Sequence, residues 1–124
     1  MKKIPERNEI AQKDKWAIED LYASPALWQE DLKKLQELGQ KLAAFSGKLH
    51  ISAQNLLDYM HLNEQVSVLY DTLGNYAYRR ADEDTRVAEF QNLVGQLTEN
   101  LCRKDKEQND DFQRVRQLEA ELFL

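Results

Sequence analysis

The sequence contains little cysteine, proline or glycine, and each scarcity narrows the possible architectures. Cys102 is the only cysteine in 124 residues. A disulfide within the chain is therefore excluded, and a reducing compartment fits. Two prolines and four glycines leave few turns, so the elements should be long. The abundant residues Gln, Glu, Lys, Leu and Ala are good helix formers, which favours helices over strands.

Long apolar runs and an excess of basic charge are also missing. No window approaches the roughly 18 apolar residues that a membrane-spanning helix needs. The first residues, Met1 to Glu6, are positively charged, but no apolar stretch follows as in a signal peptide. We therefore expect a cytoplasmic protein without a membrane partner. The net charge of −5 argues against nucleic acid as the main partner, because binding phosphates requires a basic surface.

The chain divides into an N-terminal arm and a helical part. Residues 1–23 predict an irregular arm, since their first half is polar and contains Pro5. A short helical anchor should end the arm, with Trp16 and Leu21 packing onto the helices that follow. Residues 24–124 predict a helical bundle, which we expect to be the N-terminal lobe segment of something larger.

The first helix of the bundle should begin at Ser24. Its hydroxyl can cap the helix, and proline suits the first helical position, where Pro25 stands. Apolar residues then recur at steps of three and four, which predicts one buried stripe. The stripe consists of Trp28, Leu32, Leu35, Leu38, Leu42 and Phe45. Gly39 could permit a close helix crossing, and Gly47 should end the helix as a left-handed cap.

A second and longer helix should run from Ser52 to about Ala81. Its heptad seam consists of Tyr59, Leu62, Val66, Leu69, Leu73 and Tyr76. Four more residues are expected to widen the apolar face, namely Leu56, Leu57, Met60 and Tyr70. A helix of about 30 residues would be about 45 Å long, which predicts an extended hairpin or a spine within a larger structure.

A third helix should follow an acidic turn. Asp82, Glu83, Asp84 and Thr85 interrupt the pattern, and Asp84 or Thr85 could cap the new helix. The heptad spacing then continues at Val87, Phe90, Val94, Leu97 and Leu101, and resumes at Val115, Leu118 and Leu122. The polar run Arg103–Asp111 leaves two interpretations open, either one continuous helix or a break at residues 109–111.

These patterns predict an all-α fold. It should consist of three long antiparallel helices in a coiled-coil-like hairpin or bundle, preceded by the irregular arm. The chain ends on apolar residues at Leu124, which favours a chain cut from something longer or one that needs a partner to cover its end.

Few residues are candidates for metal chemistry. His61 and Glu64 stand three apart and could offer two ligands, but a structural zinc site needs about four, and His50 is too far along the chain. A solvated surface pair is the better interpretation. Asp82 to Asp84 could suggest a cation loop, yet Val87 occupies the position where an EF-hand requires glycine. A solvated turn is again favoured.

Two other groups have both a functional and a structural interpretation. Cys102 could be a reactive thiol beside Arg103 and Lys104, although a half-buried structural cysteine is favoured. An aromatic and basic cluster could contact a peptide, since Tyr and Arg are common in recognition surfaces. Its members are Tyr70, Tyr76, Tyr78, Arg79 and Arg80. The structural interpretation places Tyr76 in the seam, while Tyr78 and the arginines line the surface or pair with acids of the neighbouring helix. We assign no catalytic, cofactor-binding or metal-binding residue.

Several segments, in their order and spacing, resemble the N-terminal region of oligoendopeptidase F, a zinc metallopeptidase related to thimet oligopeptidase. The segments are Lys2 to Arg7, Trp16 to Ser24, Trp28 to Leu32, Phe45 to Leu49 with Ser52 following, and Tyr76 to Thr85. The resemblance covers residues 1 to about 101, and the run from Arg103 to Asp111 departs from the family.

The resemblance implies a part of a mostly helical cytoplasmic oligopeptidase. In that family a deep cleft admits short peptides, and zinc held by a His-Glu-x-x-His helix and a downstream glutamate activates water. The zinc helix lies far toward the C-terminus, and the N-terminal helices help wall the cleft. None of these ligands maps onto this sequence. The implied partners are the rest of the peptidase chain and, in the full enzyme, oligopeptides.

The expected function is therefore that of an inactive helical segment of a zinc peptidase, with zinc in the full-length family and none in this chain. The alternative is a stand-alone helical module that self-associates through its heptad seams. Both interpretations predict a homo-oligomer for the isolated chain, because uncovered apolar faces associate.

Overall fold

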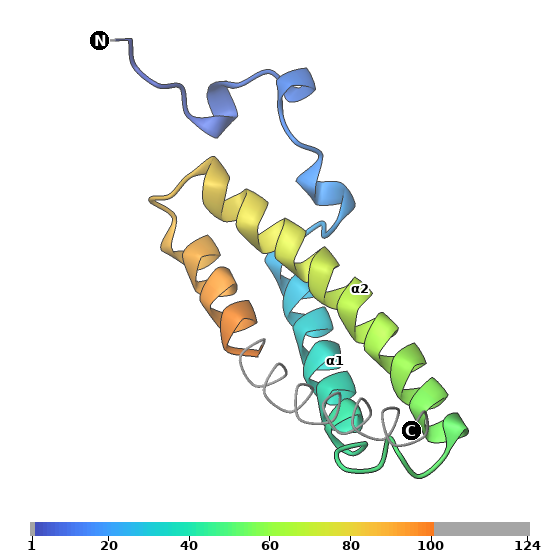
Figure 1. Ribbon diagram of the computed structural model, residues 1–124. Helices are drawn as coiled ribbons and strands as arrows, with labels where there is room; N and C mark the ends of the chain where they lie inside the picture. The colour runs from blue at the N-terminus through green and yellow to red at the C-terminus, as the bar shows by residue number, and fades with distance from the viewer. Residues whose placement is uncertain (1, 101–124) are drawn as a thin grey trace.

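The computed structural model describes residues 2–100 as an irregular arm followed by antiparallel helices (Figure 1). The arm contains three short 3-10 turns, η1 Arg7–Glu9, η2 Gln12–Asp14 and η3 Ile18–Asp20. The long helices are α1 Pro25–Ala43 and α2 Ala53–Glu83, and residues 88–100 form a further helix. Residues 2–100 contain no strand, so the predicted all-α fold with an irregular arm is confirmed. None of the helices in this range has the length and hydropathy needed to cross a membrane.

The two long helices begin where their caps predict. Ser24 is extended, with φ −153°, and proline follows it at the first turn of α1. The Ser24 hydroxyl, however, makes no capping hydrogen bond. The backbone carbonyl of Ser24 accepts the backbone N–H of Trp28. The Ser52 hydroxyl does cap α2, accepting the N–H of Asn55 at 3.1 Å. α2 extends two residues past the predicted end, to Glu83.

Two expectations about glycines need correction. α1 ends at Ala43, before the predicted stop at Gly47, which lies in the connecting turns with φ 70°. Gly39 permits no close crossing, since a Cβ there would meet nothing within 4 Å. The close approach occurs at the buried Gly74 of α2 instead. A Cβ at this position would lie 3.5 Å from Cδ2 of Leu97, so the third helix packs against α2 here.

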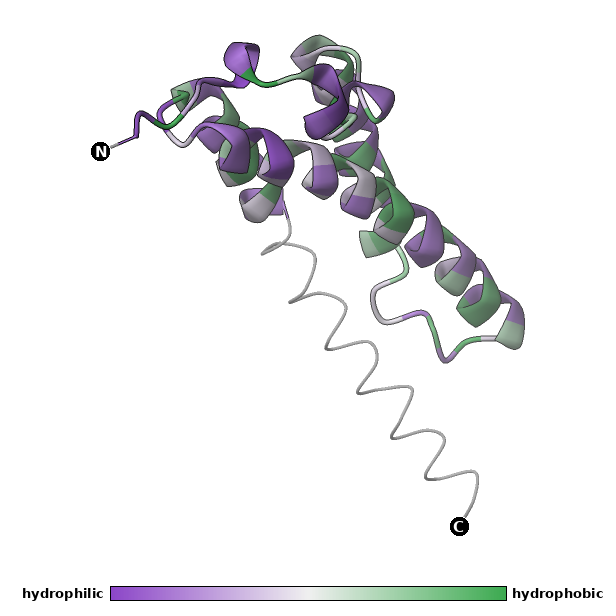
Figure 2. Cartoon of the chain, turned by 90° about the horizontal axis from the view of Figure 1, so that it is seen from above, coloured by the Kyte–Doolittle hydropathy of each residue, from purple (hydrophilic) through white to green (hydrophobic). Residues whose placement is uncertain are grey.

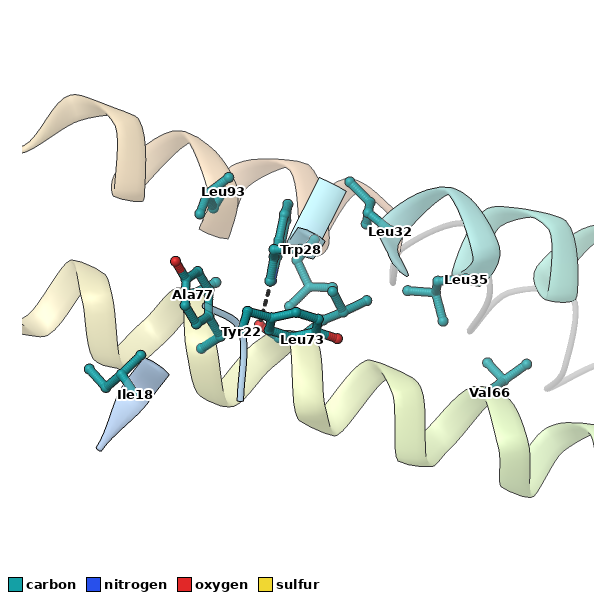
Figure 3. Packing of buried hydrophobic residues seen from close by; sticks show 11 residues of the cluster. Ile18, Tyr22, Trp28, Leu32, Leu35, Val66, Leu73, Ala77 and Leu93 are labelled. Atoms are coloured by element: carbon teal, nitrogen blue, oxygen red, sulfur yellow. Dashed lines mark hydrogen bonds between the residues drawn. The ribbon is translucent and has the colours of Figure 1, made fainter. Parts of the chain in front are cut away.

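The main core joins the arm and all three helices (Figure 3). Its buried members are Ile18, Tyr22, Trp28, Leu32, Leu35, Val66, Leu73, Tyr76, Ala77, Leu93 and Leu97. The indole of the fully buried Trp28 donates a hydrogen bond to the carbonyl of Leu73 at 2.9 Å, which fixes α1 against α2. A smaller cluster of Leu42, Leu49 and Tyr59 closes the other end of this pair. Most of the predicted seam is thus buried, and polar and apolar segments alternate along the helices (Figure 2).

The residues that anchor the arm differ from those predicted. Ile18 and Tyr22 are buried, whereas Trp16 and Leu21 are 53% and 42% exposed. The η3 turn brings residues 18 and 22 to the same side, toward the helices. The ring of Tyr22 then meets that of Tyr76 edge-on, with 5.4 Å between centroids.

Two more expectations were wrong. Leu57 and Met60 do not widen the buried face of α2, because both are exposed on its outer side. The third helix is capped by neither Asp84 nor Thr85. It begins after Val87, whose carbonyl accepts the N–H of Gln91. Cys102, the continuity of the last helix through Arg103–Asp111 and the heptad positions beyond lie outside the described residues.

Candidate functional site

The aromatic and basic cluster divides between the core and the surface. Tyr76 is fully buried in the seam, and Tyr78 is exposed. The guanidinium of Arg80 lies over the ring of Tyr76 at 5.4 Å and over that of Phe90 at 5.7 Å. Arg79 instead covers the exposed ring of Trp16, at 5.2 Å. The structural interpretation is therefore correct for Tyr76 and Tyr78, whereas the acids paired with Arg80 lie in the arm and on α2 itself rather than on the neighbouring helix.

Four charged side chains form a closed ionic ring where the arm meets the end of α2. The ring consists of Arg7, Glu19, Arg80 and Glu83. Nη2 of Arg80 lies 3.3 Å from Oε1 of Glu19, and its Nη1 lies 3.4 Å from Oε2 of Glu83. Nη2 of Arg7 lies 2.9 Å from Oε1 of Glu19, and its Nη1 pairs with Oε1 of Glu83. Two positive and two negative charges compensate each other, so the ring can be partly buried without net charge.

The surroundings keep two members of the ring, Glu19 and Arg80, ionised. Burial lowers the pKa of Arg80, but Tyr76, Glu83 and Glu19 raise it by more, so the pKa of Arg80 lies above its ordinary value. The pKa of Glu19 is lowered by its own backbone N–H; burial opposes this, and Arg7 and Arg80 lower it further. Both groups are therefore charged at neutral pH, as the ion pairs require.

A second ionic contact holds the acidic turn after α2. The carboxylate of Asp84 accepts the backbone N–H of Arg86 at 3.0 Å and its Nε at 2.8 Å. Hydrogen bonds from Arg86 lower the pKa of Asp84 to about 2. Arg86 also reaches Glu6 of the arm, at 3.0 Å. Asp84 is thus engaged by Arg86 within the turn.

The sequence analysis named Arg80 and the acidic residues 82–84 as candidates, but it did not identify their ion pairs with the arm. Arg7 and Glu19 lie in the arm, 76 and 61 residues from their partners Glu83 and Arg80. No local spacing links residues so distant in the chain. The only available signal was the presence of opposite charges in both segments, which is too common to be specific.

The pair His61 and Glu64 lies at an open groove between α1 and α2. The groove has a volume of about 670 Å³, and Asp31 and Val68 also line it. Asp31 is already engaged, since it accepts hydrogen bonds from Tyr22 and Lys34. Among residues 2–100, no group of three or more His, Cys, Asp or Glu side chains could hold a metal ion. The zinc that the family resemblance implies has no fitting ligand set in this part of the chain.

The described residues therefore define a helical scaffold with a tightly attached arm. Within residues 2–100, the aromatic and basic cluster takes part in packing and ion pairs, and the acidic run takes part in ion pairs and a turn. The function of such a scaffold is therefore best sought by comparison with related proteins.

The chain is similar to bacterial oligopeptidases over about three quarters of its length. It is 31% identical over 90 residues to the oligopeptidase PepF of Bacillus subtilis, covering 73% of this chain and 13% of PepF. It is 28% identical over 92 residues to the group B oligopeptidase PepB of Streptococcus agalactiae, covering 74% and 15%. It is 30% identical over 93 residues to an oligoendopeptidase F homolog of Lactococcus lactis, covering 74% and 16%.

These matches confirm the resemblance: the chain is related to oligoendopeptidase F. It matches only about one seventh of the length of these relatives, which is consistent with an N-terminal fragment of such a protein. No protein-family model and no solved structure matches the chain.

Proposed function

We propose that this chain is the N-terminal helical segment of an oligoendopeptidase F-like zinc metallopeptidase that hydrolyses short peptides in the cytoplasm. In this proposal residues 1–23 are the arm, and residues 24–124 belong to the N-terminal lobe. The segment helps wall the substrate cleft and supplies no catalytic residue. One observation carries this proposal: three quarters of the chain matches about one seventh of each peptidase.

The construction of the segment suits a wall. α2 has 31 residues and is therefore about 46 Å long. Trp28 fixes it to α1, and the ionic ring fixes the arm to its end. A long helix braced on several sides bends little, which supports a role in shaping a cleft. The rest of the peptidase chain then provides the zinc site and the opposite wall.

An activity assay tests whether catalysis lies elsewhere. The purified chain, incubated with zinc and short peptides, is expected to show no hydrolysis above the blank. Cleavage that a chelator abolishes, retained through further purification, would contradict the proposal. The reading frame beyond the codon for Leu124 provides a second test, since continuation to a His-Glu-x-x-His motif is expected.

The second candidate is a stand-alone helical module that self-associates. The exposed apolar side chains on the outer side of α2 favour it, because such residues commonly mark interaction sites. A stop codon directly after Leu124 in the intact gene would support this candidate over the first.

A further inference from the structure

We infer that the outer face of α2, defined by Leu57, Met60 and Val68, docks against the rest of the peptidase chain. This inference rests on the proposed function and deepens it, because it names the surface through which the segment joins the larger protein. The partner surface should be apolar at its centre and basic around it.

The three apolar residues form one stripe on α2. They stand at positions i, i+3 and i+11, which share a side of a helix with 3.6 residues per turn. They are 45%, 55% and 61% exposed, respectively. The buried positions Tyr59 and Val66 lie on the opposite side. The outer side of α2 therefore carries three exposed apolar side chains, with the exposed Glu64 at i+7 between them.

A hollow adjoins the stripe. Val68 belongs both to the stripe and to the lining of the groove between α1 and α2, where His61 and Glu64 also lie. The groove of about 670 Å³ could accept side chains from a surface that covers the stripe. An apolar centre with a polar margin is the usual composition of a protein interface.

Charge distinguishes the possible occupants of this face. No lysine or arginine occurs between Lys48 and Arg79. The exposed acids on this part of α2 are Asp58, Glu64 and Asp71. A second copy of the chain would bring the same acids against these and would be repelled, whereas a basic partner surface would be attracted. The relatives have about six sevenths of their length outside the matched segment, so such a surface has ample chain to come from.

Co-expression tests the inference. The full 124-residue chain, carrying an affinity tag, is produced together with Bacillus subtilis PepF that lacks the region matched by this chain. The matched region of PepF itself, expressed in the same way, is the positive control. We expect the chain to recover the shortened PepF, and Leu57→Glu to reduce the recovery about tenfold, as for an interface hot spot.

Leu27→Glu is the matched control for Leu57→Glu. Both leucines lie in the first turns of a helix and are equally exposed, at 44% and 45%, but Leu27 is on α1 and outside the stripe. Leu27→Glu should leave recovery unchanged, and Val68→Glu should reduce it as Leu57→Glu does. Helical circular dichroism equal to that of the parent chain would show that the variants fold.

Each outcome has a separate meaning. If the parent chain recovers no PepF while the positive control does, the proposed function fails. If Leu57→Glu and Val68→Glu recover as much as the parent, or Leu27→Glu is equally impaired, only the docking face is wrong. Recovery should also decrease between about 0.05 and 0.5 M salt, because salt screens charge attraction. Stronger binding at high salt would contradict the predicted basic partner surface.

Discussion

Arg80 is the residue at which the arm, α2 and the third helix meet. Its guanidinium lies over the rings of Tyr76 and Phe90 and pairs with Glu19 and Glu83. A guanidinium is planar and permanently charged, and it can stack and donate several hydrogen bonds at once. Lysine lacks this combination. The Arg80 side chain therefore links the arm, α2 and the third helix through stacking and ion pairs at one point.

Replacing Arg80 by alanine should lower the free energy of unfolding by about 2 kcal/mol. The change opens a space between two rings and leaves the mostly buried Glu83 with fewer partners. Arg80→Lys should recover only part of the loss. Urea unfolding followed by circular dichroism measures the effect.

Arg79→Ala is the control for this measurement. Arg79 is exposed and covers the exposed ring of Trp16, so its removal should cost about 1 kcal/mol or less. A loss from Arg80→Ala no larger than that from Arg79→Ala would show that the ionic ring contributes little to stability.

At the scale of elements, the attachment of the arm should depend on pH. The pKa of Glu19 in the folded chain lies below its ordinary value of 4.5. Its ionised form therefore stabilises the fold above the pKa of the unfolded chain, and this stabilisation is lost as the pH falls through the folded pKa. Glu19→Gln removes the effect. The parent chain should unfold at a higher temperature than Glu19→Gln at pH 7, and the difference should disappear in strong acid. A difference that is the same at pH 7 and pH 2 would contradict the assignment.

Replacing each of two glycines by alanine should change the stability of the chain in opposite directions. Gly39 lies in α1 with open space around a Cβ, so Gly39→Ala should stabilise the chain by about 0.5 to 1 kcal/mol through helix propensity. Gly47 has φ 70°, which alanine adopts with strain, so Gly47→Ala should destabilise it by about 1 kcal/mol. Thermal unfolding of both variants compares them directly. The same sign for both would mean that the connecting turns rearrange to accept a side chain.

Elements whose signals are local could be predicted from the sequence, and contacts between distant segments could not. Ser52 marks a helix start through a bond made within one turn, and Pro25 does so because its fixed φ suits the first helical position. Both predicted starts agree with the helix boundaries. The contact of Arg7 with Glu83 joins residues 76 apart. Likewise, hydrophobicity alone favoured Trp16 as the anchor of the arm. In the structure Ile18 is the buried anchor, because the η3 turn determines which side chains of the arm face the helices.

For the whole molecule, the inner and outer sides of α2 have different consequences. The inner side is covered by α1, the arm and the third helix, and it accounts for the fold. The outer side carries the exposed stripe of Leu57, Met60 and Val68 among acids. These three side chains belong to neither of the buried cores within the described residues. A surface that the fold does not need, and whose acids repel a second copy, is where a larger protein would attach.

The isolated chain should therefore self-associate weakly, and more strongly in salt. In the isolated chain the stripe stays uncovered and favours association, while the acids around it oppose the approach of a second copy. Salt screens this repulsion, since the Debye length falls to about 3 Å at 1 M. Sedimentation velocity at rising protein concentration should show more oligomer at about 0.5 M than at about 0.05 M salt. Leu57→Glu should abolish the oligomer and Leu27→Glu should not. A chain that stays monomeric at high concentration in both salts would show that the stripe alone cannot hold two copies together.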